Sequence, residues 1–359
     1  MRTVSLPPGL VRASRKVNMK KFAHLGLLSL LITFCHGRFL TFPKLPCPIP
    51  EDILPCTCTG DENGTMDMDC SHVVSEDELE KVFSSFFPYT MFRNFTVVDN
   101  TYLKTLRNQA LGIASFTGVY IMNSVLEVVE PDALSSSFAT ARVVNMQNNS
   151  ISSFPFETLP SFTSLLELGL SDNNLTFPAL ESETLLMLDL SNNQIQNVAA
   201  TAFLDVPEIS EIYLGGNQIS HIPTGTFAGH YNLHIVNLES NSLTYLPEGA
   251  IQLTCSRSGT VNLRRNQITD IAVNSIIEVG NLDMSNNNLT VLEEHIFRPL
   301  LSQGTILEIQ GCPLTCGCDI AWLIRDPLLL ELVAEGAACF NGMLLVDLDP
   351  GIFDSMGCP

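Results

Sequence analysis

Basic side chains are scarce in this sequence. Its 359 residues include 18 Lys and Arg against 38 Asp and Glu, a formal net charge of −20. Residues 1–37 hold six of the basic residues and no acidic one: Arg2, Arg12, Arg15, Lys16, Lys20 and Lys21. Without them the balance is 12 against 38, or −26. Nucleic-acid binding requires clustered Lys and Arg, and anionic membranes attract the same side chains. The charge balance therefore argues against both kinds of partner.

Long hydrophobic runs are also missing. The apolar run 25–34 (LGLLSLLITF) has ten residues, whereas a membrane span takes roughly 20. A basic segment precedes this run and the small residues Cys35 and Gly37 follow it, an order typical of a secretory signal peptide. We predict a signal peptide over residues 1–37, with a cut after Gly37 or up to residue 39. A buried core helix is the alternative. No hydrophobic tail for a lipid anchor follows at the C-terminus, so we expect a soluble, extracellular protein.

Familiar catalytic motifs are absent as well. The sequence contains no nucleophile elbow, phosphate loop, dinucleotide fingerprint or H-E-x-x-H pair. We therefore predict a non-enzymatic chain with no catalytic residue, no metal and no cofactor. Residues 61–69 alternate oxygen ligands somewhat as a calcium loop does, but the terminal bidentate Glu is missing, which favours a polar hairpin. His230 and His234 are four residues apart, and we expect surface or loop histidines there rather than a metal pair.

A sequence repeat determines the predicted fold. Residues 188–195 follow the pattern L-x-L-x-x-N-x-L, and ten copies occur in register. The residues at the Asn position, here called the ladder, are Asn100, Ser124, Asn149, Asn173, Asn193, Asn217, Asn241, Asn266, Asn287 and Cys312. Their spacings of 20 to 25 residues fall in the range of about 20–29 residues that leucine-rich repeats show. The period predicts one elongated solenoid rather than several globular domains.

Each copy also predicts its own local structure. The two aliphatic positions of L-x-L turn inward from a short strand and the residues beside them face outward, because strand side chains alternate. Stacked strands then form a curved parallel sheet on the concave side. Each ladder Asn is expected to bond backbone groups of adjacent coils that would otherwise be buried and unpaired. Ser124 and Cys312 can replace Asn only in part.

The convex side is predicted to be mostly irregular. A second apolar row recurs there at Phe203, Phe227 and Phe297. Pro223 and Pro247 fit an extended outer connection rather than a helix. The predicted fold is a leucine-rich repeat solenoid of the α/β type, with a cap at each end.

Cysteines cluster where a solenoid needs its caps. Four precede the first repeat and four follow the last: Cys47, Cys56, Cys58 and Cys70, then Cys316, Cys318, Cys339 and Cys358. Spacing alone leaves three pairings for each set of four. Zinc binding is the alternative, but an oxidising secretory route favours disulfides. Cys255 and Cys312 remain, and both are predicted to be buried thiols.

The caps resemble known modules. Residues 316–323 read C-x-C-x-x-x-W-L, which resembles the cysteine-rich flanking modules of extracellular leucine-rich repeat proteins. This resemblance implies the pairs Cys316–Cys339 and Cys318–Cys358, and Cys47–Cys58 and Cys56–Cys70 at the N-terminus. The N-terminal cap departs from the usual short form, because Ser75-x-x-Glu78 is a capping box that predicts a helix through about Phe87. The predicted boundaries are 38–93 for the N-terminal cap, 94–311 for the repeats and 312–359 for the C-terminal cap.

Outward positions of the concave strands form the predicted partner-binding face. These positions are Tyr120, Met122, Glu167, Asp189, Glu211, Tyr213, Glu239, Arg264 and Asp283. Acidic side chains with a few aromatics suit a protein partner, including a basic one; a merely solvated face is the alternative. Asn-x-Ser/Thr sequons predict glycosylation at Asn63, Asn94, Asn148, Asn174 and Asn288.

The whole chain resembles one group of secreted crustacean proteins. The run 47–58 (CPIPEDILPCTC), the cap helix, the repeat number and the length are similar to those of the non-catalytic subunits of coelenterazine luciferases. This resemblance implies a secreted hetero-oligomer in which a separate small catalytic subunit oxidises coelenterazine, and in which this chain binds and stabilises or solubilises that subunit. The alternative is a soluble leucine-rich repeat recognition protein of innate immunity or matrix, unrelated to luminescence.

Overall fold

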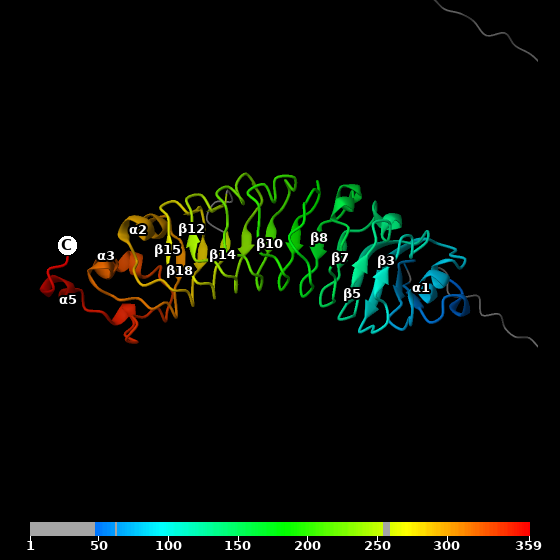
Figure 1. The fold of residues 1–359 in the computed structure, drawn as a ribbon, viewed down its shortest axis with the longest axis horizontal. Coiled ribbons are helices and arrows are strands. Elements are labelled where there is room, and N and C mark those ends of the chain that lie inside the picture. The colour runs from blue at the N-terminus through cyan, green and yellow to red at the C-terminus, as the bar shows by residue number, and fades with distance from the viewer. Residues whose placement is uncertain (1–46, 62, 254–258) are drawn as a thin grey trace, which may run out of the picture. The chain divides into compact units, whose positions relative to one another are not determined.

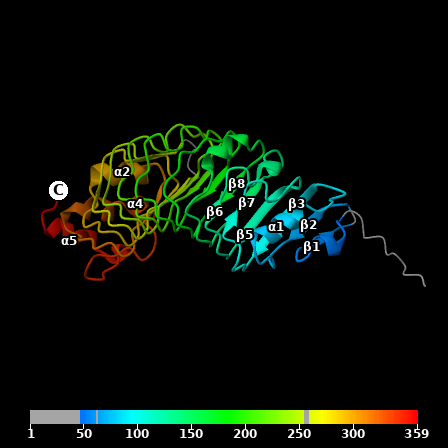
Figure 2. The same cartoon turned by 45° about the vertical axis from the view of Figure 1, so that its right-hand side comes forward.

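The structure is a computed structural model that describes residues 47–61, 63–253 and 259–359. These residues all belong to one compact unit, Phe42–Pro359. Figures 1 and 2 show this unit as a curved stack of coils. The predicted signal peptide and Cys255 lie outside the described residues. Within the described part of the chain, no helix is long and apolar enough to cross a membrane.

One sheet runs through the whole stack (Figure 1). Its strands in spatial order are β1 (Thr57–Gly60), β2 (Met66–Asp69), β3 (Met91–Val98), β5 (Ser115–Met122), β7 (Val143–Asn145), β8 (Glu167–Gly169), β9 (Met187–Asp189), β10 (Glu211–Tyr213), β11 (Ile235–Asn237), β14 (Thr260–Asn262), β17 (Asn281–Asp283) and β18 (Ile306–Glu308). β1 and β2 pair antiparallel, and every later pair is parallel. The register sets the first aliphatic residue of each copy beside that of the next, as Leu188 lies between Leu168 and Ile212. The sequence repeat thus becomes a buried stack of side chains.

The ladder asparagines join neighbouring coils. At Asn217, Nδ2 donates to the carbonyl oxygens of Leu190 and Leu214, each at 3.0 Å, and Oδ1 accepts the N–H of Ile195 at 3.0 Å. The other buried ladder asparagines between β7 and β17 repeat this arrangement. Ser124 Oγ donates within its own coil to Met122 O, and Cys312 Sγ donates to Met284 O at 3.4 Å. Both residues replace Asn only in part, as predicted.

The convex side is mostly irregular, with short paired strands: β4 (Thr105–Leu106) with β6 (Val128–Val129), β12 (Tyr245–Leu246) with β15 (Asp270–Ile271), and β13 (Ile251–Gln252) with β16 (Ile276–Ile277). Two 3-10 helices, η2 (Ser135–Ser137) and η3 (Phe156–Ser161), also lie between strands of the main sheet. Phe203 and Phe227 are fully buried, and their ring centroids are 5.6 Å apart. Phe297 is buried too, but it lies on the helix α2 (Glu294–Ser302), so this coil departs from an irregular connection.

The N-terminal cap contains η1 (Pro50–Asp52), the β1–β2 hairpin and α1 (Glu76–Phe83). Ser75 Oγ accepts the N–H of Glu78 at 3.2 Å, which is half of the predicted capping box. The Glu78 carboxylate accepts the N–H of Val74 at 2.8 Å rather than that of Ser75. The prediction that the helix continues to about Phe87 is wrong, because it ends at Phe83. Two serines follow with hydroxyls bonded to a carbonyl of the last turn, and a proline at position 88 disfavours helical backbone at residue 87.

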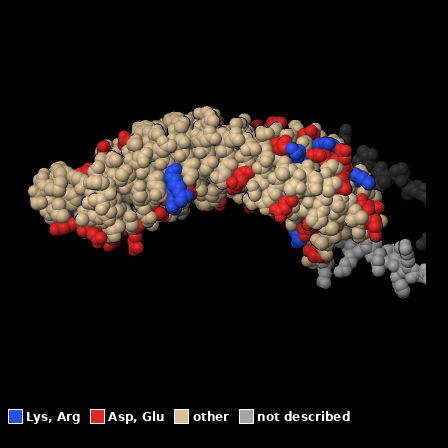
Figure 3. Space-filling view, turned by 60° about the horizontal axis from the view of Figure 1, so that its bottom comes forward, with Lys and Arg blue, Asp and Glu red and all other residues tan. Residues whose placement is uncertain are grey.

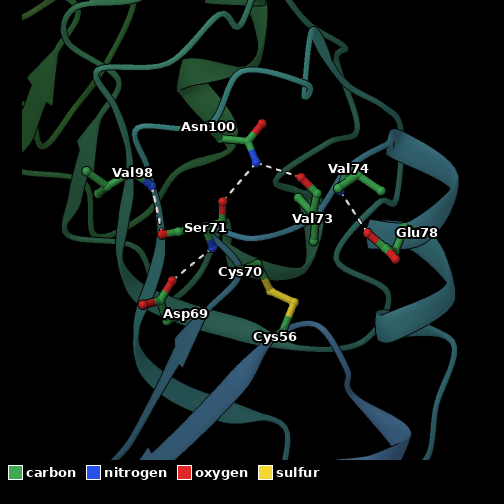
Figure 4. Close-up of a disulfide and its surroundings, with 9 residues drawn as sticks. All are labelled: Cys56, Asp69, Cys70, Ser71, Val73, Val74, Glu78, Val98 and Asn100. Atoms are coloured by element: carbon green, nitrogen blue, oxygen red, sulfur yellow. Dashed lines mark hydrogen bonds between the residues drawn. A yellow bond between two sulfur atoms is a disulfide. The ribbon is translucent and has the colours of Figure 1, made fainter.

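Figure 4 shows how this cap is tied to the first coil. The Cys56–Cys70 disulfide lies beside Ser71, whose hydroxyl accepts the N–H of Val98 at 2.9 Å. Asn100 Nδ2 donates to the carbonyl oxygens of Ser71 and Val73, at 2.9 and 2.7 Å. The amide nitrogen of the first ladder residue therefore bonds the cap as later ones bond the preceding coil, whereas its Oδ1 accepts the N–H groups of Tyr102 and Leu103 in its own coil.

The C-terminal cap consists of short helical turns: η4 (Cys318–Ile320), α3 (Ala321–Ile324), α4 (Pro327–Leu330), η5 (Leu345–Asp347) and α5 (Pro350–Ser355). Trp322 Nε1 donates to Leu292 O at 2.9 Å, and the Arg298 guanidinium lies 5.2 Å from the ring centroid. The disulfides of the described residues are Cys47–Cys58, Cys56–Cys70, Cys316–Cys339 and Cys318–Cys358, the pairs that the resemblance implies. Cys312 is a buried free cysteine, and burial raises the pKa of its thiol.

Candidate protein-interaction face

The concave sheet presents outward side chains in rows that follow from the strand register. One row, here called the central row, runs through Thr96, Tyr120, Asn145, Gly169, Asp189, Tyr213, Asn237, Asn262, Asp283 and Glu308. Glu167 and Glu211 lie two residues before this row in their own coils, and Met122, Glu239 and Arg264 lie two residues after it. The predicted face therefore extends from β5 to β17. Figure 3 shows carboxylates spread along this side, with one basic group about midway and further basic groups toward the right-hand end.

The tightest group on the face surrounds Glu211 on β10. One oxygen of its carboxylate accepts the hydroxyl hydrogen of Tyr213 at 2.8 Å. The other lies 3.7 Å from Nε2 of His234, from the coil that follows. Asp189, on the neighbouring strand β9, is paired in register with Tyr213. Three coils thus bring two carboxylates, a phenol and an imidazole together.

This environment shifts the ionisation of Tyr213. Partial burial, then the hydrogen bond to Glu211 and the negative charges of Glu211 and Asp189, raise the pKa of the Tyr213 phenol to about 12. The phenol therefore stays neutral over the physiological range and donates to Glu211. The oxygen of a phenol that donates to a carboxylate can still accept a hydrogen bond from a Lys or Arg side chain of a partner, and the phenol keeps its proton.

A second group forms where the basic residues interrupt the acidic side chains. Glu239 accepts a hydrogen bond from Asn262 Nδ2 at 3.2 Å and lies 3.4 Å from Nη1 of Arg265. Its neighbour Arg264 takes part in none of the ion pairs of the described residues. Arg264 Nε is buried without a hydrogen-bond partner among them. The Arg265 charge is thus offset within the chain, whereas the Arg264 charge is not.

Part of the central row also maintains the fold. Asp189 Oδ1 accepts the N–H of Ser191 at 2.9 Å, and Asp283 Oδ1 accepts the N–H of Ser285 at 2.8 Å. The central-row asparagines at 145, 237 and 262 make the same bond two residues on. These acidic side chains stabilise the turn after each strand, so their presence does not by itself indicate a partner. Glu167 and Glu211 make no such bond and are better probes of binding.

Tyr120 lies across the floor of the face. A Cβ placed on Gly118 would meet Cε2 of Tyr120 at 2.6 Å and Oδ1 of Asn94 at 2.7 Å. The Tyr120 ring therefore covers Gly118, and any larger residue there would displace it. Asn94 contributes to the same floor, because it is paired in register with Gly118.

The sequons differ in exposure. Asn63, Asn148, Asn174 and Asn288 are exposed, whereas Asn94 is half-buried. Asn148 has a φ of 52°, and its Nδ2 donates to Oδ1 of Asn123 at 3.0 Å. Glycan at Asn94 or Asn148 would lie on the face or at its edge.

His230 and His234 both lie outside helices and strands, which agrees with the expectation of surface or loop histidines. His234 is the residue before β11 and contacts the Glu211 group. Because it directly precedes a strand of the concave sheet, the sequence could have indicated this contact. His230 is buried within its loop, and burial lowers the pKa of its imidazole. The predicted polar hairpin is the β1–β2 pair, and in its turn Asp61 accepts the N–H groups of Asn63 and Thr65, each at 2.9 Å. No group of three metal-ligating side chains occurs in the described parts of the chain.

Known proteins resemble the chain in sequence and in fold. No protein-family model matches it. The Oplophorus-luciferin 2-monooxygenase non-catalytic subunit of Oplophorus gracilirostris is 36% identical over 340 residues, covering 91% of this chain and 95% of that protein.

Solved structures add a likeness of fold alone. A chain of the octameric complex of Latrophilin 3, Unc5D and FLRT2 (LRR) has a TM-score of 0.66 at 21% identity, covering 84% of this chain and 93% of that one. A chain of the Drosophila Toll–Spatzle complex has a TM-score of 0.53 at 14% identity, covering 79% and 44%. At these identities the two structures show only that the fold is that of a leucine-rich repeat protein.

Proposed function

Because the chain belongs to the family of the Oplophorus-luciferin 2-monooxygenase non-catalytic subunit, we propose that it is a secreted, non-catalytic accessory subunit of a coelenterazine-type luciferase. As a disulfide-capped leucine-rich repeat solenoid, it binds a separate small catalytic subunit and stabilises or solubilises it. The observation that carries this proposal is the similarity itself, which extends over 91% of the chain. It therefore extends over repeats and at least part of each cap rather than over one shared motif.

The concave face supports binding as the role of the chain. Among its outward side chains Glu167 is exposed, and Glu211 and Glu239 are half-buried. Acidic residues outnumber basic ones among the predicted outward positions of this face. Complementary charge speeds association and selects partners more than it adds raw affinity. We therefore place the catalytic subunit on this face, with basic side chains of that subunit opposite the Glu211 group.

Co-expression in a secretory host tests the proposal. The chain should co-purify with the small catalytic subunit and slow the loss of its coelenterazine-dependent light emission. The chain alone should produce no light with coelenterazine beyond that of buffer. Appreciable turnover by the chain alone would refute the non-catalytic role. A chain that remains a free monomer at micromolar concentration beside the catalytic subunit would refute the complex.

Charge reversal tests the face. Glu167→Lys combined with Glu211→Lys should weaken binding of the catalytic subunit about tenfold or more and flatten its dependence on salt. Glu183→Lys is the matched control, since Glu183 is exposed in the segment between β8 and β9, outside the strands. If the control weakens binding as much as the double variant, net charge alone is responsible and the concave location is wrong.

A further inference from the structure

The C-terminal cap exposes apolar side chains on one short hairpin. Ala338 bridges Leu344 in antiparallel sense, and the N–H of Cys339 donates to Met343 O at 2.8 Å. Four apolar side chains are open to solvent here, and we call them the hairpin patch: Phe340 (73% exposed), Met343 (46%), Leu344 (37%) and Val346 (62%). Residues 337, 339 and 345 between and beside them are buried. The hairpin therefore has an inner and an outer apolar side.

The turn residues account for the backbone of the hairpin but not for its exposed apolar side chains. Gly342 adopts a φ of +85°, and Asn341 Oδ1 accepts the N–H of Met343 at 3.0 Å, so Asn and Gly serve the turn. No backbone requirement calls for Phe at position 340. The Cys316–Cys339 disulfide fixes the hairpin, and the N–H of Phe340 donates to Leu314 O at 2.8 Å. The patch is thus held in place before any partner binds, which lowers the entropy cost of binding.

The C-terminal segment that carries the patch is predominantly acidic. Residues 312–359 contain one basic residue, Arg325, and seven acidic ones: Asp319, Asp326, Glu331, Glu335, Asp347, Asp349 and Asp354. The balance is 1 − 7 = −6. Arg325 is already bonded to Asp354 at 2.7 Å. Asp347 and Asp349 follow Val346 closely, and neither has a cationic partner within ion-pair distance among the described residues. On the side shown in Figure 3, the C-terminal end at the left carries carboxylates and no basic group.

We propose that the hairpin patch is a docking surface for a protein whose contact area has apolar side chains ringed by Lys and Arg. An apolar centre with a polar rim is the usual anatomy of a protein interface, and here the rim is acidic. A second copy of this chain would bring two acidic rims together, and an anionic membrane would be repelled by the same carboxylates. This inference goes beyond the proposed function, which uses the concave sheet.

A synthetic probe tests the patch independently of any luciferase. The probe is a fluorescent amphipathic helical peptide of Leu and Lys; one control peptide has Glu for Lys and another has Ser for Leu. The full chain should bind only the Leu/Lys peptide, with an affinity that falls as salt is added. Phe340→Ser combined with Val346→Ser should weaken that binding about tenfold or more, and Asp347→Lys should also weaken it.

Matched variants keep the test sharp. Leu204→Ser and Tyr231→Ser remove apolar side chains that are 68% and 82% exposed on other coils, and they should bind the peptide as the parent does. The hairpin variants should melt at the parent temperature, since the replaced side chains are exposed. The inference would be overturned if the hairpin variants bind the peptide as well as the parent does, or if the parent does not bind it. It would also be overturned if Glu167→Lys/Glu211→Lys loses binding while the hairpin variants keep it. Dimerisation through the patch in sedimentation would overturn it as well. The luciferase co-purification can fail or succeed without changing any of these results.

Discussion

Replacing one ladder residue should measure how much the coil-to-coil bonding contributes to stability. Asn217 is buried in the middle of the stack, and its Oδ1 accepts the N–H of Ile195 at 3.0 Å. In Asn217→Ala this N–H loses its partner. Leu190 O keeps a bond from Asn193 Nδ2 at 3.1 Å, and Leu214 O keeps one from Asn241 Nδ2 at 2.9 Å. The principal penalty is therefore one orphaned N–H rather than three unpaired groups.

The expected cost follows from that count. A buried donor without a partner costs about 1–3 kcal/mol, and a small cavity adds about 1 kcal/mol. Asn217→Ala should thus reduce the free energy of unfolding by about 2–4 kcal/mol. Gln218→Ala is the control, since Gln218 is exposed and, among the described residues, its side chain bonds only Gln196, at 3.2 Å. This change should alter stability by less than about 0.5 kcal/mol.

Urea denaturation followed by circular dichroism gives the stability, and hydrogen exchange of the Ile195 amide gives the local effect. Asn217→Asp provides a further check, because it keeps the acceptor for Ile195 but turns a carboxylate toward the two carbonyls. Burial beside them raises the pKa of that carboxyl, so its stability relative to the parent should improve as pH falls. An Ile195 amide still protected in Asn217→Ala, or equal midpoints for Asn217→Ala and Gln218→Ala, would refute the reasoning.

Three other outcomes are expected. Glu211→Gln should lower the pKa of Tyr213 from about 12 toward 10.0 in an absorbance titration of the phenolate. Because the pKa of Tyr213 is higher in the folded than in the unfolded protein, the stability that the neutral phenol contributes is complete below about pH 10 and is lost as pH rises to about 12. An unchanged titration would count against the Glu211 contact. Replacing Cys316 and Cys339 together by Ser should lower stability by about 3 kcal/mol, since the pair closes a segment of 23 residues; an unchanged melting temperature would contradict this. Peptide mapping of secreted protein should find glycan at Asn63, Asn174 and Asn288 and little at Asn94, whose side chain lies on the floor of the sheet; full occupancy of Asn94 would show that the floor is open.

The sequence anticipated the architecture because the repeat is a local signal with a constant environment. Each L-x-L-x-x-N copy meets nearly the same neighbours in the next coil, so Leu188 and Asn193 could be placed without knowing the rest of the chain. The C-terminal end of the cap helix is harder to predict from the sequence. The capping box marks where it starts, whereas its end depends on competition between Ser84, Ser85 and the backbone of the last turn.

Sequence by itself therefore determined the stack of coils, the inward rows and the outward positions of the concave face, because strand alternation and the repeat period leave little freedom. Only the tertiary structure decided how outward residues pair. His234 reaches Glu211 and Arg265 reaches Glu239, while Arg264 Nε has no hydrogen-bond partner in the part of the chain that the structure describes, because these contacts depend on side-chain conformations across coils. The tertiary structure likewise decided that Phe340 and Val346 face solvent, because a disulfide outside the repeat period holds their hairpin.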